Sequence, residues 1–292
     1  MTQPVVNVRE LAKSFGAKSV LNGISAAAQA GDIIGVLGKN GAGKTTLLEV
    51  LLGLSPPSSG SAEILGENSL QLSEAVKAQI GFVPQQDELV DLLTGTQQLK
   101  VTAAFYRRWD RELVDRLSAE WQIPLTRRIQ TLSVGERQKL SLLLALGHQP
   151  LLLVLDEPVA SLDPIARRGF IRQILDVADS GNRTVLFSSH IVSDLERVAN
   201  KVWIIKDGAL AWQGDLDALK ESVVRLHIRA RKELPAALEV PHQMSSRIDG
   251  RHATVAVTHW RHEQTALLAA DLDADLEVEN LGLEDIFVEL HR

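Results

Sequence analysis

Apolar residues in this chain occur either in short continuous runs or in longer stretches where they recur every three or four positions. The runs Asp32–Leu37, Leu151–Asp156 and Thr184–Ser188 predict strands that are buried on both faces of a sheet. Between the last two runs, residues 165–178 carry an apolar stripe at helical spacing, made of Ile165, Phe170, Ile171, Ile174, Leu175 and Ala178. Strand, helix and strand of these lengths predict an α/β domain with a largely parallel sheet.

Two further patterns belong to the same domain. Val5–Val8 and Val20–Ile24 are typical of short strands around a turn at Phe15–Lys18, which predicts an antiparallel β subdomain. Residues 87–150 are mainly helical in pattern, and apolar residues recur there every four positions, at Phe105, Trp109, Leu113, Leu117 and Trp121. We interpret this repeat as the buried face of a helix, in preference to an aromatic ligand cage.

The pattern changes after Lys220. Alternating residues predict strands and helical spacing predicts helices, in the order strand Val223–Ala230, strand Ala253–Thr258, helix Glu263–Ala270, strand Leu276–Asn280 and helix Glu284–Leu290. The sequence therefore predicts a large α/β domain over 1–219, with its helical subdomain at about 87–150, and a small C-terminal α+β domain over 220–292.

Composition limits the kinds of partner and the kinds of chemistry that we expect for this chain. The net charge of −6 over 292 residues argues against a nucleic-acid partner. The absence of cysteine excludes disulfides, thiolate metal sites and cysteine nucleophiles, and it suits the cytosol. The first residues mix Asn7 and Arg9 with apolar side chains and do not resemble a signal peptide. The longest apolar stretch, Leu151–Leu155, is far shorter than the ~20 residues that span a bilayer.

A glycine-rich segment after the first buried run predicts a phosphate site. Residues 38–45 have the pattern G-x-x-x-x-G-K-T, in which Gly38, Gly41 and Gly43 let backbone N–H groups surround a phosphate. Lys44 can reach the β- and γ-phosphates of a nucleotide, and the Thr45 hydroxyl can bind Mg²⁺. The residues between and beside these, Lys39, Asn40, Ala42 and Thr46, are expected to contribute to the same site. A helix over Thr46–Leu54 should follow and stop at Pro56 and Pro57.

Two acids follow the second buried run. Asp156 and Glu157 should stand at the carboxyl tip of a strand, where Asp156 can hold Mg²⁺ and Glu157 can act as general base toward the attacking water. The alternative is that this pair only caps the next helix. A metal site made of the scattered C-terminal histidines is disfavoured, because His259 and His262 have no third ligand at suitable spacing.

A third motif, TLSVGERQKL at residues 131–140, identifies the family when taken with the other two. Ser133 is a good helix N-cap and Glu136 completes a capping box, so an ordinary helix start is the simpler alternative. Together the three motifs resemble the nucleotide-binding subunit of ABC transporters, whose signature is LSGGQ. The resemblance covers about residues 4–216 and implies a P-loop NTPase fold. It further implies that Ser133, Gly135 and Glu136 contact the γ-phosphate held by a second copy of the chain.

The resemblance also assigns residues that spacing alone does not. Phe15, with Val20 nearby, matches the aromatic position that stacks on adenine. Gln85 matches the glutamine that touches Mg²⁺ and the attacking water and links the site to the membrane partner. His190 matches the histidine that contacts the γ-phosphate and orients the catalytic carboxylate, and residues 161–163 match a loop that crosses the dimer interface. One departure is Val134, at a glycine position of the signature, where valine requires ordinary helical or extended backbone geometry.

The end of the chain bears on the direction of transport. Residues 283–290 resemble the terminal helix of ATPases that pair with ABC-2-type permeases, which are generally exporters. The resemblance thus implies an ATPase homodimer that binds ATP and Mg²⁺ and drives a separate integral membrane permease from the cytoplasmic side, with residues 85–106 as the link. Two alternatives stay open, an importer subunit and a soluble ABC ATPase that acts on nucleic acid or the ribosome.

Overall fold

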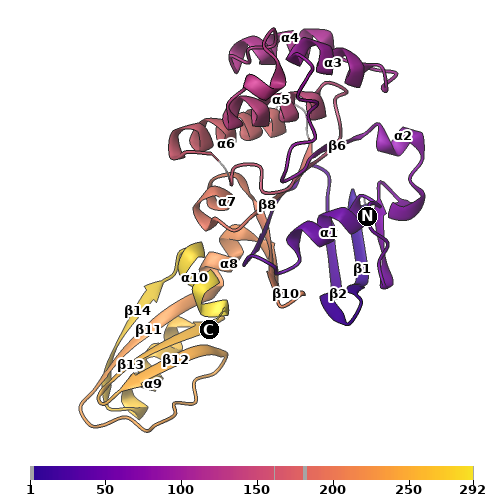
Figure 1. The fold of residues 1–292 in the computed structure, drawn as a ribbon. Coiled ribbons are helices and arrows are strands. Elements are labelled where there is room, and N and C mark those ends of the chain that lie inside the picture. Colours follow the sequence, from indigo (N-terminus) through magenta and orange to yellow (C-terminus); the bar gives the residue numbers. More distant parts are fainter. Residues whose placement is uncertain (1–2, 161, 180–182, 292) are drawn as a thin grey trace. The chain divides into compact units, whose positions relative to one another are not determined.

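A computed structural model describes residues 3–160, 162–179 and 183–291, and Figure 1 shows the order of its elements. The chain divides into two compact units, Met1–Gln213 and Gly214–Arg292. Within the described residues, no helix has both the length and the apolar character needed to cross a bilayer. Ser161, which belongs to the expected interface loop, lies outside the described residues.

The first unit is built on a six-stranded sheet in the order β10-β9-β3-β8-β7-β6. β3 pairs in parallel with β8 and β9, and β7 pairs in parallel with β6 and β8. Every residue of β7 and β8 is buried, which confirms the prediction of a parallel sheet covered on both faces. The strands are β3 (Ile33–Gly38), β6 (Ile80–Val83), β7 (Leu152–Leu155), β8 (Thr184–Ser189), β9 (Lys201–Lys206) and β10 (Ala209–Asp215).

A second sheet of the same unit is antiparallel, in the order β2-β1-β4-β5. Its strands are β1 (Val6–Phe15), β2 (Lys18–Ala28), β4 (Ser59–Ile64) and β5 (Glu67–Asn68). The expected turn is present, because Phe15 pairs with Lys18 across it. Both strands are longer than the sequence pattern predicts, because their polar residues face outward and extend the pairing without adding an apolar signal.

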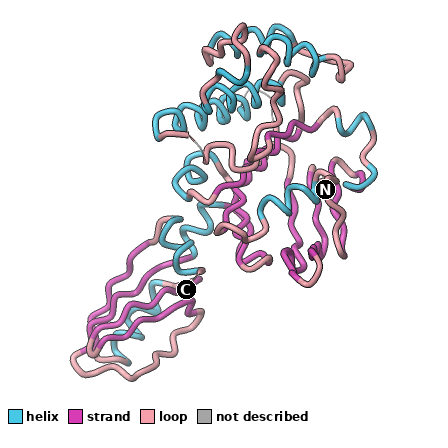
Figure 2. The backbone as a smooth tube through the Cα atoms, in the orientation of Figure 1, coloured by secondary structure: helices cyan, strands magenta, loops and turns pink. Residues whose placement is uncertain are grey.

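Helices cover the parallel sheet, and α3, α4 and α5 lie together beside β6, as the helix colouring of Figure 2 also shows. The helices of this unit are α1 (Lys44–Leu51), α2 (Glu74–Lys77), α3 (Gly95–Ala103), α4 (Arg111–Glu120), α5 (Val134–Leu146), α6 (Pro164–Asp179) and α7 (Val192–Val198), with two 3₁₀ turns at Ser69–Gln71 and Ile129–Thr131. The helical subdomain expected at about 87–150 thus corresponds to α3, α4 and α5.

Three details of the helix predictions were wrong. α1 ends at Leu51, because Gly53 has a φ of 72° and lies so close to Ser69 that a side chain could not fit, so the chain turns before the two prolines. Ile165 is 85% exposed, because it stands in the first turn of α6. The four-residue repeat is not one helix face: Phe105 follows α3 and is 81% exposed, whereas Leu117 and Trp121 are buried at α4.

The second unit is a four-stranded antiparallel sheet in the order β12-β13-β11-β14. Its elements are α8 (Leu216–Ser222), β11 (Val223–Ala230), β12 (Gln243–Asp249), β13 (His252–Thr258), α9 (His262–Asp271), β14 (Ala274–Asn280) and α10 (Leu283–Leu290). Five of these were predicted. α8 and β12 were missed, and β12 gives no alternating apolar signal because its residues are exposed or half-buried.

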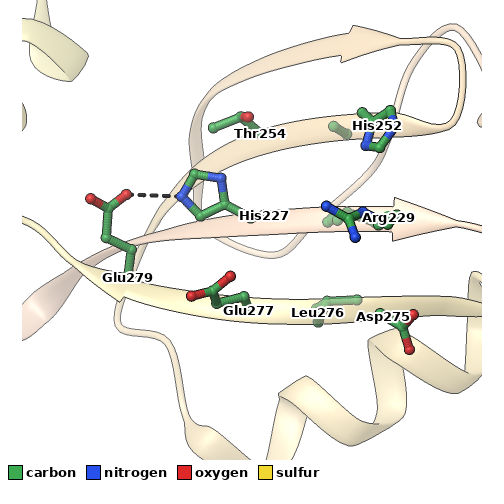
Figure 3. A pocket seen from close by; sticks show the side chains of 10 residues that line it. His227, Arg229, His252, Thr254, Asp275, Leu276, Glu277 and Glu279 are labelled. Carbon is green, nitrogen blue, oxygen red and sulfur yellow. Dashed lines mark hydrogen bonds and ion pairs between the residues drawn. The ribbon is translucent and has the colours of Figure 1, made fainter.

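The two faces of this sheet differ in chemistry. Leu226, Ile228 and Val255 belong to the apolar face, which packs with Leu268 and Leu272 of the α9 region. The opposite face is polar and bounds an open hollow of about 580 Å³ over β11, β13 and β14 (Figure 3). The labelled residues around this hollow are His227, Arg229, His252, Thr254, Asp275, Leu276, Glu277 and Glu279. Such a face is what an antiparallel sheet with one solvated side presents.

Candidate functional site

The candidate site lies where four neighbouring strands of the parallel sheet end. β3 leads into the glycine loop, β8 into His190, β7 into Asp156 and Glu157, and β6 toward Gln85. Because these strands are parallel and adjacent in the order β3-β8-β7-β6, their carboxyl ends meet at one edge. Ligands of open α/β sheets bind at this edge. The topology therefore brings together residues that lie more than 150 positions apart in the chain.

The glycine loop has the backbone geometry of a phosphate cradle. Gly41 and Gly43 have φ values of 79° and 106°, which residues with a side chain adopt rarely. A Cβ on Gly43 would lie 2.8 Å from a methyl of Leu21 and 3.0 Å from the Val20 carbonyl oxygen. Gly43 is also the N-cap of α1, whose first backbone N–H groups face the loop without a side-chain cap. These features leave room and donors for an anion.

Lys44 is the buried cation of the site. Its Nζ donates to the carbonyl oxygens of Gly38 at 2.9 Å and Lys39 at 3.3 Å. It also forms an ion pair with Glu157 Oε1 at 3.0 Å, and the two side chains are 5% and 6% exposed. Two buried opposite charges at this distance attract one another, and loss of either would leave the other buried without its counter-ion. Lys44 is thus held at the loop, with Glu157 as its counter-ion.

Glu157 is fixed by two further contacts, one of which continues to Asp156. Its Oε2 lies 2.5 Å from His190 Nδ1, and its backbone N–H donates to Ser188 Oγ at 2.8 Å. Ser188 Oγ donates in turn to Asp156 Oδ1 at 2.6 Å. Glu157 has a φ of 47°, an uncommon value for a residue with a side chain. Backbone strain of this kind persists where the surroundings determine the conformation, and it is common at functional sites.

A cavity of about 330 Å³ opens beside these groups. Its lining combines residues from the loop, the start of α1 and three other segments, namely Lys18, Val20, Asn40, Gly41, Gly43, Lys44, Thr45, Thr46, Gln85 and Glu157. From the sequence, we expected eight of these ten as nucleotide or metal contacts and a ninth, Glu157, as the general base. Lys18 was not predicted. Gly38, Lys39 and Ala42 belong to the loop, but the lining does not include them.

Phe15 stands next to this cavity and does not belong to its lining. It is the strand partner of the lining residue Lys18, and its ring is exposed with Lys13 Nζ 4.7 Å from the ring centroid. An exposed aromatic ring under a cation is available for stacking. The contact of Phe15 with a base, which the resemblance implies, stays a prediction.

Ser133, Gly135 and Glu136 lie at the start of α5 and are also absent from the cavity lining. Ser133 Oγ accepts the Glu136 N–H at 3.3 Å, and Glu136 Oε2 accepts the Ser133 N–H at 2.6 Å, so the expected capping box is present. The hydrogen bond from the Ser133 backbone lowers the pKa of Glu136. Val134 is the first helical residue, as its β-branched side chain required, and both Ser133 and Val134 are exposed. This helix start can meet a second molecule.

The residues present fit Mg²⁺ carried with a triphosphate. Thr45 and Gln85 offer a hydroxyl and an amide oxygen in the cavity, and Asp156 lies beside Glu157 at the end of β7. The described residues include no group of three or more histidines and acids arranged to hold a metal. An all-oxygen set with one dedicated carboxylate suits Mg²⁺, which keeps several waters and binds through substrate phosphates.

Ser188 and Lys18 are the two site residues that the sequence did not indicate. Ser188 follows the apolar residues 185–187 of a buried strand and lies two residues before His190, and a fully buried hydroxyl at that place is a weak signal for a hydrogen-bonded site. Lys18 gives no signal of its own, because a lysine in a turn is common.

Comparison with known proteins agrees with this geometry. Residues 21–160 match the family described as ABC transporter. The Nod factor export ATP-binding protein I of Rhizobium meliloti (strain 1021) is 30% identical over 98% of this chain and 87% of its own. The bacitracin transport ATP-binding protein BcrA of Bacillus licheniformis is 33% identical over 74% of this chain and 72% of its own.

Solved structures share the fold of the first unit. A structure described as the ATP binding subunit of an ABC transporter has 26% identity and a TM-score of 0.67, and the match covers 74% of this chain and 92% of that one. The dimeric ATP-binding cassette MJ0796, bound to ADP and Pi, has 21% identity and a TM-score of 0.64 over 72% of this chain and 98% of its own. The chain belongs to the ATP-binding subunits of ABC transporters, a family of ATPases with homologues of the exporter type.

Proposed function

We propose that this chain hydrolyses ATP as a homodimer and that hydrolysis powers export through a separate integral membrane permease at the cytoplasmic face of the membrane. The observation that carries the proposal is the placement of Glu157. Its carboxylate lines the phosphate cavity and is held from both sides, by Lys44 at 3.0 Å and by His190 at 2.5 Å. A carboxylate fixed in this way beside a phosphate site is positioned to accept a proton from water.

The residues divide the chemistry among them. Lys44 and the backbone N–H groups of the loop bind the β- and γ-phosphates of ATP, and Phe15 stacks on the adenine ring. Mg²⁺, when bound by Thr45, Gln85 and Asp156, neutralises phosphate charge. Glu157 takes the proton of the attacking water, and His190 holds the Glu157 carboxylate in the orientation that this transfer requires. Lys44 must leave Glu157 to bind phosphate, so ATP binding itself frees the base.

A second copy of the chain completes each site. The start of α5 is exposed at Ser133 and Val134 and lies apart from the cavity of its own protomer. Helix N-termini attract anions through their free N–H groups and dipole. In a head-to-tail dimer, Ser133, Gly135 and Glu136 of one copy face the γ-phosphate bound by the other. The triphosphate then joins the two copies, and hydrolysis separates them.

The permease contact is proposed for residues 85–106, as the family resemblance implies. Four large apolar side chains are exposed in this segment, namely Val90, Leu92, Val101 and Phe105. Exposed apolar side chains that form a patch often mark the binding surface for a partner protein. The segment begins at Gln85, which lines the phosphate cavity, so nucleotide binding and the permease contact involve the same stretch of chain. Export is favoured because relatives with 30% and 33% identity are named as Nod factor export and bacitracin transport proteins.

Affinity purification from detergent-solubilised membranes, followed by mass spectrometry, tests the partner. We expect the tagged chain to retain an integral membrane protein, and Phe105→Glu to lose it while the protein still binds ATP. Leu54→Glu is the matched control, because Leu54 is also a large, mostly exposed apolar side chain but lies after α1, outside this segment. Recovery of no integral protein by the wild-type chain would contradict the proposal, and transport assays of the recovered pair would distinguish export from import.

A further inference from the structure

Arg137 lies in the first turn of α5 and connects this helix to the segment after β6 that contains Gln85. Its Nε donates to Asp87 Oδ2 at 2.9 Å, and a second guanidinium nitrogen donates to Asp87 Oδ1 at 2.5 Å. The third nitrogen donates to Asp91 Oδ1 at 2.7 Å and to the Ile129 carbonyl oxygen at 3.3 Å. One side chain therefore joins α5 to the segment that follows β6.

Both ends of this connection are close to the proposed chemistry. Asp87 lies two residues after Gln85, which lines the phosphate cavity. Arg137 lies four residues after Ser133, the N-cap of the helix that would face the partner's nucleotide. Backbone bonds reinforce the connection, because Ile129 N–H donates to the Leu93 carbonyl oxygen at 2.9 Å and Gln130 N–H donates to the Asp91 carbonyl oxygen at 3.1 Å.

The Arg137–Asp87 pair has the geometry of a strong and directional contact. Two parallel N–H to oxygen bonds fix both distance and angle, which a single lysine cannot do. The side chains are 21% and 20% exposed, so solvent screens them less than a surface pair. The hydrogen bonds that Arg137 donates to the Asp87 carboxylate raise the pKa of Arg137 well above its usual value. Asp91 is mostly exposed and contributes less.

We propose that Arg137 is a positioning residue that transmits the nucleotide-dependent movement of Gln85 in one protomer to the α5 start that acts on the nucleotide of the other. This inference rests on the proposed function. A bound γ-phosphate that draws Gln85 inward also moves Asp87, and the bidentate contact carries α5 with it. Arg137 does not line the phosphate cavity of its own protomer, so its loss leaves nucleotide binding to a single protomer intact and impairs the step that needs both copies.

Steady-state hydrolysis and nucleotide binding by Arg137→Met test this inference, with Arg116→Met as the matched control. Arg116 lies in the same helical subdomain on α4 and forms only an exposed pair with Glu120 at 3.8 Å. We expect Arg137→Met to bind nucleotide at dilute protein within about twofold of wild type. Its maximal rate should fall about tenfold, as expected for loss of a coupling between contacting groups. Its Hill coefficient for ATP should fall to about 1.

Two further variants sharpen the test. Arg137→Lys should recover part of the rate, because it keeps the charge without the bidentate geometry. Asp87→Asn leaves Arg137 held by Asp91 and Ile129, and should show the same loss even if Arg137→Met folds poorly. Wild-type rate and Hill coefficient in both Arg137→Met and Asp87→Asn would overturn this inference alone. A wild-type chain that binds ATP without hydrolysing it would overturn the proposed function, and this inference with it.

Discussion

Replacement of Glu157 by glutamine separates the two roles that the structure gives this side chain. The substitution keeps the size and shape of the group and removes its charge. The amide oxygen can still face Lys44 and the amide nitrogen can still face His190, so the geometry at the end of β7 should survive. What is lost is a proton acceptor for water and the counter-ion of Lys44, which lies 3.0 Å away.

The expected effects can be estimated from this geometry. Loss of a positioned general base lowers the rate by about 10²–10⁴-fold, or about 3–5 kcal/mol in the barrier. The Lys44–Glu157 attraction at 3.0 Å is about 5.5 kcal/mol for an effective dielectric constant of ~20, and desolvation of the two groups offsets most of it. If about a quarter of this attraction remains after desolvation, ATP must break about 1.4 kcal/mol of ion pairing when it binds the wild-type chain. Glu157→Gln lacks this ion pair, so its affinity for ATP as a single protomer should be about tenfold higher.

Phosphate release and ATP titration measure the two effects in the same preparation. We expect Glu157→Gln to bind ATP at least as tightly as wild type, to release almost no phosphate and to elute as a dimer when ATP is present. Glu74→Gln is the control, because Glu74 is an exposed carboxylate on α2. A hydrolysis rate for Glu157→Gln within about twofold of wild type would refute the assignment of this residue as the base.

Three other outcomes follow from individual contacts. Val134→Gly removes an exposed side chain from the first position of α5; it should lower stability by about 0.5–1 kcal/mol and leave hydrolysis active, and a thermal scan with a rate assay checks both. Burial lowers the pKa of His148, so His148 is protonated less readily in the folded protein than in the unfolded chain. The stabilisation is therefore present above the unfolded pKa of about 6.5 and is lost as pH falls below it. Thermal midpoints between pH 8 and pH 5 should show this loss, and His148→Gln should reduce it, whereas the exposed-residue variant His252→Gln should not. Chelation of Mg²⁺ by EDTA should abolish phosphate release from the wild-type chain, and added Mg²⁺ should restore it.

The parts of the site that the sequence predicted are those that local spacing determines. The glycine loop, Lys44 and Thr45 lie within eight residues, and the strand before them is a continuous apolar run, so both the geometry and its context are visible in one segment. Asp156 and Glu157 were likewise placed by the run that precedes them. The capping box of Ser133 and Glu136 depends on a spacing of three residues and was equally accessible.

The parts that were not predicted depend on contacts between distant segments. Ser188 meets Asp156 across 32 residues, and Arg137 meets Asp87 across 50, and both contacts depend on which strands and helices become neighbours. Periodicity also failed at helix ends. Phe105 and Ile165 fit the apolar spacing, but one follows α3 and the other starts α6, and both are largely exposed there. Spacing indicates that a helix has an apolar stripe, and tertiary packing decides where the stripe is buried.

Isothermal titration of the wild-type chain and of Lys44→Ala with MgATP is the most direct test of the phosphate site. Lys44 is the only cation that the described structure buries beside the loop and pairs with Glu157. We expect saturable binding of one ATP per wild-type chain, and a loss of about 10- to 100-fold in affinity for Lys44→Ala, as for removal of a charged hydrogen-bond donor. Absence of any binding by the wild-type chain with Mg²⁺ present, or equal affinity in the variant, would contradict the assignment of this site.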